Sequence, residues 1–233
     1  MADEITETAK AVQETAKATG KAIDCLRETG GFFSRVFGDL VEDGVGIVAD
    51  KLKYYRLERA TLLAEKTQER LKERGVEATV AVPPKTALPL IENATLEDND
   101  DLHTLWANLL ANAMDPAKAH QVKHIHVSIL KGMEPLHVGI LSSMAHEKIT
   151  RYPDKAFNEV HFDRAKIAEG FNVPEDMVDV ALLNLMRLGC VTPGIVSGGI
   201  SMGSHKVSSY KGTELVHLST LGLSLVLATR GDA

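Results

Sequence analysis

Apolar residues recur at helical spacing through the middle of the chain, most completely between residues 102 and 113. The apolar positions there follow the pattern i, i+3, i+4, i+7, i+8 and i+11, namely Leu102, Leu105, Trp106, Leu109, Leu110 and Ala113. This spacing lines one face of an α-helix and does not alternate as a strand does. Shorter patterns of the same kind occupy residues 86–94, 119–131 and 135–150. The sequence therefore predicts a mainly α fold with a central helical body over residues 83–151.

The first 82 residues have the pattern of an N-terminal helical arm. The segment ETAKA of residues 7–11 recurs at residues 14–18, within a heptad pattern that predicts a helix over residues 1–29 and a candidate coiled coil. Its apolar seam is thin, so this helix needs a partner, either a second chain or the body of this one. Residues 30–82 continue the arm with an amphipathic helix and a charged helix. Because Pro83-Pro84 cannot lie inside a helix, we place the principal internal boundary there.

Residues 152–233 have the element order of a winged-helix-like module. Helical patterns over 164–171 and 175–188 precede two alternating segments, 206–210 and 214–218, which we expect to form a small β-hairpin turning at Lys211-Gly212. A helix, a turn, a second helix and a hairpin form the order of a winged helix-turn-helix.

The second helix of that module would enter a DNA groove if the module bound DNA. The side chains expected to face outward are mostly acidic or neutral: Glu175, Asp176, Asp179, Asn184 and Arg187. The side chains expected to face inward are apolar: Met177, Val180, Ala181, Leu185 and Leu188. DNA phosphates require cationic contacts, and the wing adds only Lys206 and Lys211 as candidates. We therefore expect a protein partner, or a second copy in a homo-oligomer, rather than nucleic acid.

The charge distribution agrees with that expectation. The chain has 26 Lys and Arg against 32 Asp and Glu, a net charge of −6. Residues 51–75 hold 8 basic and 4 acidic side chains, whereas residues 1–50 hold 5 and 10. Alternating basic and acidic segments suit helices that dock on one another, within or between chains.

No pattern of a known enzyme or metal site survives inspection. Cys25 and Cys190 are too far apart in sequence to form a metal or redox motif. His120 and His124 stand at i, i+4 and could share a helix face, but the chain has no H-E-x-x-H motif. A hydrolase in this histidine-rich middle remains a hypothesis, to be tested by replacing both histidines. We expect no enzyme activity, no catalytic residue, no cofactor and no metal.

Membrane insertion is also not expected. No apolar run approaches the roughly 20 residues that span a bilayer, and the first 26 residues lack the apolar core of a signal peptide. We therefore expect a cytoplasmic protein. The amphipathic segment 32–49 has a mainly acidic polar face, whereas anionic lipid favours Lys and Arg, so peripheral membrane contact is the less favoured alternative.

Three stretches together resemble a bacterial family, the Abi-alpha (abortive infection alpha) family. They are ADKLKYYR at residues 49–56, the stretch 89–116 that ends in LWANLLANAMDP, and the pair LMRLG and LSTLG at residues 185–189 and 218–222. The resemblance covers about residues 40–225. It implies a cytosolic bacterial protein linked to phage defence, and it supplies no catalytic residue.

The LWANLLANAMDP motif offers the main candidate site residues. Trp106 belongs to the core stripe, while Asn108, Asn112 and Asp115 share a polar edge. That edge is either a helix-end packing and capping feature or a surface that recognises a partner. We expect a non-enzymatic interaction protein of antiviral defence that self-associates or binds a partner through its helices. The alternatives are a winged-helix DNA-binding transcription regulator and a membrane-acting effector that uses the N-terminal amphipathic helices.

Overall fold

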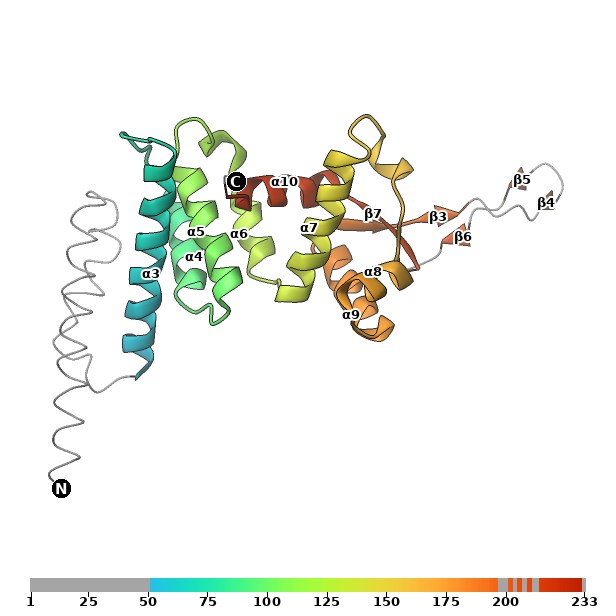
Figure 1. Cartoon of the computed structure of the whole chain (residues 1–233), viewed down its shortest axis with the longest axis horizontal. Coiled ribbons are helices and arrows are strands. Elements are labelled where there is room, and N and C mark those ends of the chain that lie inside the picture. Colours follow the sequence, from blue (N-terminus) through green and yellow to red (C-terminus); the bar gives the residue numbers. More distant parts are fainter. Residues whose placement is uncertain (1–50, 197–200, 203–204, 207–208, 211–213, 232–233) are drawn as a thin grey trace, which may run out of the picture. The chain divides into compact units, whose positions relative to one another are not determined.

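The computed structural model of the chain describes residues 51–196, 201–202, 205–206, 209–210 and 214–231. The chain is mainly helical with a small three-stranded antiparallel sheet (Figure 1), which confirms the predicted fold class. It divides into two compact units, and their described residues are 51–131 with 228–231 in unit 1 and most of 132–227 in unit 2. The predicted heptad helix and the amphipathic segment 32–49 lie outside the described residues.

Unit 1 is built from helices. In chain order they are α3 (Lys51–Glu73), α4 (Pro84–Ala94), α5 (Asp100–Met114), the 3-10 turn η2 (Ala119–Gln121) and α6 (His124–Leu130). Helix α5 lies beside α3 and α4 (Figure 1). The apolar stripe of α5 meets the other helices in a core whose largest fully buried side chains are Leu63, Leu90, Trp106, Leu109, Leu110 and Leu130.

Local sequence sets the ends of these helices. Asn99 caps α5, because its side-chain oxygen accepts the backbone N–H groups of Asp101 and Leu102 at 3.1 and 3.0 Å. Pro84 begins α4, where its missing N–H costs nothing. Beyond α3, Gly75 has a φ of 65°, a left-handed conformation that glycine adopts without strain.

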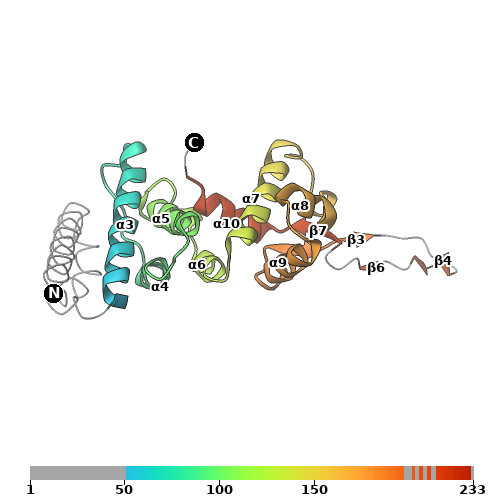
Figure 2. The same cartoon turned by 60° about the horizontal axis from the view of Figure 1, so that its bottom comes forward.

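Unit 2 combines helices with the sheet. Its elements are α7 (Pro135–Thr150), the 3-10 turn η3 (Phe157–Glu159), β1 (Phe162–Asp163), α8 (Arg164–Phe171), α9 (Glu175–Arg187), β2 (Val191–Pro193), β7 (Leu215–Leu218) and α10 (Thr220–Thr229), whose last two residues are grouped with unit 1. Strand β7 is central and pairs antiparallel with β1 and β2. Figure 2 shows α8 and α9 beside α7. The fully buried side chains Ile140, Leu141 and Leu182 form the centre of this core.

The helix–turn–helix of unit 2 is closed by a left-handed residue. Asn172 ends α8 at φ 52° and ψ 46°, and its N–H donates to carbonyl oxygens of the last turn of α8. Asparagine tolerates this conformation better than most residues, and the predicted helix over 164–171 is confirmed. At the far end of α9, Gly189 has a φ of 74°.

The predicted hairpin pairing is wrong. The described residues Lys206, Ser209 and Tyr210 do not pair with β7, because β7 lies between β1 and β2. Further out, β3 (Ile195–Val196) pairs with β6 (Ser209–Tyr210), and β4 (Ser201–Met202) pairs with β5 (His205–Lys206). The described residues therefore form two short antiparallel pairs, β3 with β6 and β4 with β5, in place of the predicted pairing.

The division into units also differs from the boundary placed at Pro83-Pro84. The two prolines lie at the start of α4 inside unit 1, and the units divide between Lys131 and Gly132. Helix α3 packs on α5 across the proline pair, so the segments on either side share one core. Among the described residues, no helix combines the length and the apolar composition that crossing a bilayer requires.

Candidate functional site

The family-like motif of α5 lies in the interior of unit 1. The Trp106 ring is almost completely buried, and its Nε1 donates to Glu97 Oε2 at 3.4 Å. Asn108, Asn112 and Asp115 are buried as well. Buried polar side chains are costly unless they are hydrogen-bonded, so their partners indicate what they do.

The two asparagines bind the C-terminal segment of unit 1. Asn108 Nδ2 donates to the Thr229 carbonyl oxygen at 3.1 Å, and Asn112 Nδ2 donates to the Ala228 carbonyl oxygen at 2.7 Å. A longer contact of 3.4 Å joins Asn112 Nδ2 to the Arg230 carbonyl oxygen. The last carbonyl groups of a helix have no partner within that helix, so the two amides satisfy the end of α10.

Asn112 also connects this cap to a buried charge pair. Arg74 Nη1 donates to Asn112 Oδ1 at 2.8 Å and lies 3.6 Å from Asp115 Oδ2. The side chains of Arg74 and Asp115 are 9% and 6% exposed, so little water screens the pair. Asp115 Oδ1 further accepts the Ala117 N–H at 2.9 Å, just beyond the end of α5. The motif thus joins the ends of α3, α5 and α10 within unit 1.

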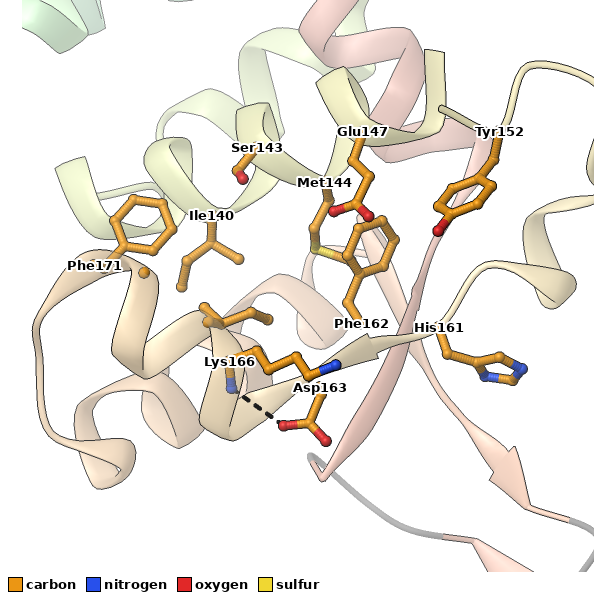
Figure 3. A pocket seen from close by; sticks show the side chains of 12 residues that line it. Ile140, Ser143, Met144, Glu147, Tyr152, His161, Phe162, Asp163, Lys166 and Phe171 are labelled. Atoms are coloured by element: carbon orange, nitrogen blue, oxygen red, sulfur yellow. Dashed lines mark hydrogen bonds between the residues drawn. The ribbon is translucent and has the colours of Figure 1, made fainter. Parts of the chain in front are cut away.

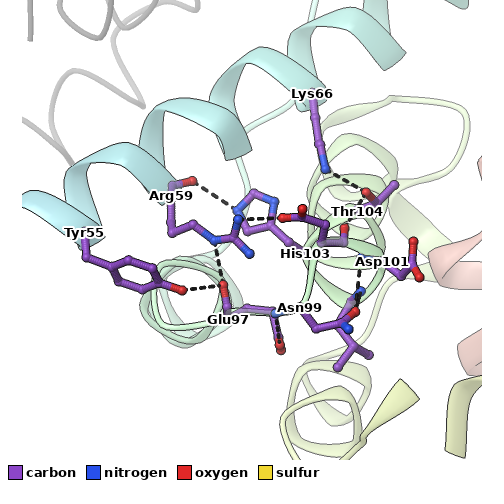
Figure 4. A network of polar contacts seen from close by, with 10 residues as sticks. Tyr55, Arg59, Lys66, Glu97, Asn99, Asp101, His103 and Thr104 are labelled. Atoms are coloured by element: carbon purple, nitrogen blue, oxygen red, sulfur yellow. Dashed lines mark hydrogen bonds and ion pairs between the residues drawn. The ribbon is translucent and has the colours of Figure 1, made fainter. Parts of the chain in front are cut away.

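A second polar network surrounds Arg59 of α3 (Figure 4). Arg59 Nε donates to the Glu97 carbonyl oxygen at 2.6 Å, and its Nη1 lies 2.7 Å from Asp100 Oδ1. The hydroxyl of Tyr55 donates to the same Glu97 carbonyl at 3.1 Å. The Arg59 guanidinium lowers the pKa of the exposed Asp100 carboxyl. This network holds the loop between α4 and α5 against α3.

His103 lies under this network and is held neutral. Its Nε2 is 3.1 Å from the Arg59 carbonyl oxygen, which can only accept, so Nε2 carries the proton. Burial, and then the nearby Arg59 charge, lower the pKa of His103 to about 4. Its Nδ1 is buried without a hydrogen-bond partner among the described residues. The pKa of His103 therefore depends on the packing of unit 1 around its imidazole.

The histidines at 120 and 124 do not form the predicted pair on one helix. His120 belongs to η2, His124 begins α6, and Val122 and Lys123 between them are extended. The shared helix face is therefore wrong, because the chain does not continue as one helix from 119 to 131. Within the described part of the chain, no three His, Cys, Asp or Glu side chains gather as metal ligands would.

Unit 2 has a pocket of about 360 Å³ between α7, β1 and α8 (Figure 3). The floor is apolar and includes the buried side chains of Ile140, Met144 and Phe162. Phe171 closes one end against α7, where a Cβ atom added to Gly139 would lie 2.7 Å from its ring. The volume is close to the lower limit for small-molecule sites.

Several of the polar side chains around that pocket have partners of their own. Glu147 lies 3.5 Å from Arg151, and Asp163 caps α8 by accepting the Lys166 N–H at 3.2 Å. The His161 ring packs against the His217 ring with centroids 4.5 Å apart. These side chains do not converge on one point above the apolar floor, so the pocket can hold an apolar group but assembles no catalytic set from the described residues.

The outer face of α9 differs from the predicted face. Met177 and Val180, expected to face inward, are 51% and 67% exposed, and that expectation is wrong. Leu183 is 57% exposed on the same helix. The inner face of α9 is instead formed by Val178, Ala181, Leu182 and Leu185. The helix that would enter a DNA groove in a winged helix therefore exposes three apolar side chains among its charged ones.

The charges of α9 lie at its ends. Arg164 of α8 pairs with Glu175 and Asp179, with its Nη2 and Nη1 each 2.8 Å from a carboxylate oxygen. These carboxylates raise the pKa of the Arg164 guanidinium, which stays charged. Asp176 at the start and Arg187 at the end are exposed. Of the two predicted wing lysines, Lys206 belongs to β5 and Lys211 lies outside the described residues.

The α9 face was missed although the sequence contains its signal. Asp176, Val180, Leu183 and Arg187 stand at i, i+4, i+7 and i+11, the spacing of one helix face. A second apolar stripe, of Val178, Ala181 and Leu185, competes with it on the other side. Periodicity alone does not decide which of two apolar stripes is buried.

A family model described as abortive infection alpha matches residues 55–224, which is more than half of the chain. The matched range includes the α5 motif and the α9 face. No curated protein and no solved structure matches the chain.

Proposed function

Because the chain belongs to the abortive infection alpha family, we propose that it acts in abortive infection as a non-enzymatic interaction protein that self-associates or binds a partner. The observation that carries the interaction role is the exposed apolar face of α9, formed by Met177, Val180 and Leu183. Contiguous exposed apolar side chains on a helix mark interaction surfaces more often than catalytic ones. We place this role in the bacterial cytoplasm.

The disposition of polar groups supports an interaction role over a catalytic one. In unit 1 the amide groups of Asn108 and Asn112 bind backbone carbonyl groups, and Asp115 faces Arg74. These side chains stabilise the fold and are enclosed by it. A catalytic group must reach a substrate, which these buried side chains do not do in this arrangement.

A DNA-binding regulator is the second candidate, and one observation favours it. The helices α7, α8 and α9 and the strands of the three-stranded sheet follow the order α7, β1, α8, α9, β2 and β7, which supports interpreting unit 2 as a winged helix. The α9 surface argues against DNA. Its cation, Arg187, lies at one end of the helix, Asp176 lies at the other end, and exposed apolar side chains lie between them. A helix in the major groove needs donors and cations along its length.

Phage challenge tests the defence role. The full chain is expressed in a susceptible bacterium and challenged with a diverse phage panel at more than one phage per cell. We expect infected cells to die with fewer progeny phage per infected cell than in cells that express a stop-codon variant. Unchanged progeny yield across the panel, with the folded chain present, contradicts a defence role.

Fluorescence anisotropy separates the two candidate mechanisms. The full chain is titrated into a labelled random-sequence duplex at physiological salt, with Lys206→Glu as the matched variant. The interaction role predicts no saturable binding. Binding that weakens steeply with salt and with Lys206→Glu would favour the DNA-binding regulator.

A further inference from the structure

We propose that the exposed face of α9 is a self-association surface that packs antiparallel against the same helix of a second copy of this chain. The surface consists of Asp176, Val180, Leu183 and Arg187, and is called the α9 stripe below. The inference deepens the self-association part of the proposed function and rests on it. It names the residues that meet and their register.

The stripe is continuous along one side of the helix. At 100° per residue, its four positions fall within an arc of roughly 60°. All four residues are exposed, and the two apolar ones are more than half exposed. Val180 and Leu183 therefore form an apolar centre, with an acid at the N-terminal end and a base at the C-terminal end.

This order of side chains is self-complementary. The midpoint between Val180 and Leu183 lies between residues 181 and 182, and so does the midpoint between Asp176 and Arg187. One two-fold axis through that midpoint places Val180 opposite the partner copy's leucine and Asp176 opposite the partner copy's arginine. Isologous pairing of this kind is the commonest symmetry of homo-oligomers.

A parallel pair would lose these contacts. Each residue would then meet its own counterpart, so Asp176 would face an aspartate and Arg187 an arginine. The helix dipoles would also point the same way, whereas they oppose each other in the antiparallel pair. Charge complementarity therefore selects the antiparallel second copy as the occupant.

The remaining acidic side chains of α9 do not oppose this pairing. Glu175 and Asp179 are held by Arg164 within the same chain. Arg187 is exposed, and its Nε and Nη2 donate to Asn184 Oδ1, one turn earlier on its own helix. That neutral contact keeps the guanidinium near the stripe without neutralising its charge.

The expected dimer is weak. A single helix pair buries less than the roughly 1,200 Å² of a standard stable interface. Association then depends on concentration, which suits a protein that responds to a change of state in the cell. We expect monomer and dimer to exchange rapidly in solution.

Sedimentation velocity of the full chain over a concentration series tests the surface. We expect the weight-average mass of the wild type to rise toward that of a dimer. Asp176→Arg and Arg187→Asp each place like charges opposite one another and should weaken association about tenfold or more. The double charge swap, Asp176→Arg with Arg187→Asp, restores opposite charges and should recover most of the affinity. Asp154→Arg changes an exposed charge of the loop after α7 and should leave the affinity unchanged.

Three outcomes overturn the proposal. The first is a wild type that stays monomeric at every concentration. The second is an affinity that is unchanged by Val180→Glu with Leu183→Glu, and the third is a double swap that associates no better than the single swaps. In the last two cases association would lie elsewhere, for example on the heptad segment 1–29. The phage assay keeps the two proposals apart: a wild type that protects but stays monomeric refutes only the surface, and dimerisation without protection refutes only the defence role.

Discussion

Unit 1 buries polar side chains, whereas α9 of unit 2 exposes apolar ones. In unit 1, Asn112 and Asp115 are enclosed and meet Arg74 and the end of α10. On α9, Val180 and Leu183 are each more than half exposed. Each feature departs from the usual rule of apolar inside and polar outside.

The difference separates buried polar side chains that belong to the fold from the exposed apolar surface for which we propose a partner. Buried polar groups stabilise only when they are paired; Asn112 is paired with backbone carbonyl groups and with Arg74, and Asp115 is paired with Arg74. Exposed apolar side chains contribute little to the stability of the chain that exposes them. The family motif lies within the fold of unit 1, and we propose the α9 stripe as the surface that a second chain binds. The substitutions below test this contrast.

The largest effect is expected at Arg74. Arg74→Met leaves the buried Asp115 carboxylate without its cation, which should lower the free energy of unfolding by about 3–5 kcal/mol. Urea unfolding followed by Trp106 fluorescence measures this, since the chain has a single tryptophan and it lies in unit 1. Arg70→Met removes an exposed pair with Glu73 and serves as control, with an expected loss below about 1 kcal/mol. Equal losses of unfolding free energy in Arg74→Met and Arg70→Met would contradict a stabilising role for the buried pair of Arg74 and Asp115.

Asn112 should matter more than Asn108. Asn112→Ala removes contacts to Arg74 and to two carbonyl groups near the C-terminus, at a cost of about 1–3 kcal/mol. Asn108→Ala removes one contact, to Thr229, and its Oδ1 is unpartnered among the described residues. Hydrogen exchange over the last turn of α10 should rise in both variants, and more in Asn112→Ala. The reverse order would argue against capping by Asn112.

Acid should weaken unit 1 through His103. The unfolded chain binds a proton at His103 near pH 6.5, whereas the folded chain binds one only near pH 4, so protonation favours unfolding. The contribution is fully present above pH 6.5 and decreases by up to about 1.4 kcal/mol per pH unit down to pH 4. Trp106-detected unfolding of His103→Gln should show a flatter pH dependence over that window. If the free energy of unfolding of His103→Gln varies with pH as steeply as that of the wild type, the conclusion that His103 is buried and neutral is wrong.

The smallest effect is expected on α9 itself. Val180→Ser replaces an exposed side chain, so under dilute conditions it should change the free energy of unfolding by no more than about 0.5 kcal/mol. Leu182→Ala, two residues along the same helix, empties a fully buried position and should cost about 2–5 kcal/mol. Circular dichroism during urea unfolding compares the two. A large loss in Val180→Ser would mean that the stripe packs within its own chain.

Helical periodicity predicted much of this fold. The stripe from Leu102 to Ala113 placed α5, and Asn172 marked the end of α8. The hairpin pairing was not predictable from alternation, because residues 206–210 alternate equally well whichever strand they pair with. The common core of α3 and α5 was not predicted, because Pro83-Pro84 was interpreted as a boundary between domains. A local break in a helix gives no information on packing between distant segments.

The candidate sites were less accessible to sequence reasoning. The polar edge of Asn108, Asn112 and Asp115 was visible, but its contacts with residues more than a hundred positions away were not. On α9, two apolar stripes made the buried side ambiguous until the neighbouring elements were placed. Whether the motif also recognises a partner stays a prediction.

Cysteine cross-linking across the α9 pair tests the central claim most directly. The background is Cys25→Ser, and Cys190 stays because burial raises the pKa of its thiol to about 12 and keeps it unreactive. Asp176→Cys and Arg187→Cys chains are oxidised separately and as a mixture. In an antiparallel pair, position 176 of one copy lies opposite position 187 of the other. The two copies of position 176 are then eleven residues apart along the helix axis, about 16 Å, and so are the two copies of position 187. We predict a covalent dimer from the mixture and little from either chain alone; equal cross-linking of each chain alone, or none in any sample, would contradict the antiparallel α9 surface.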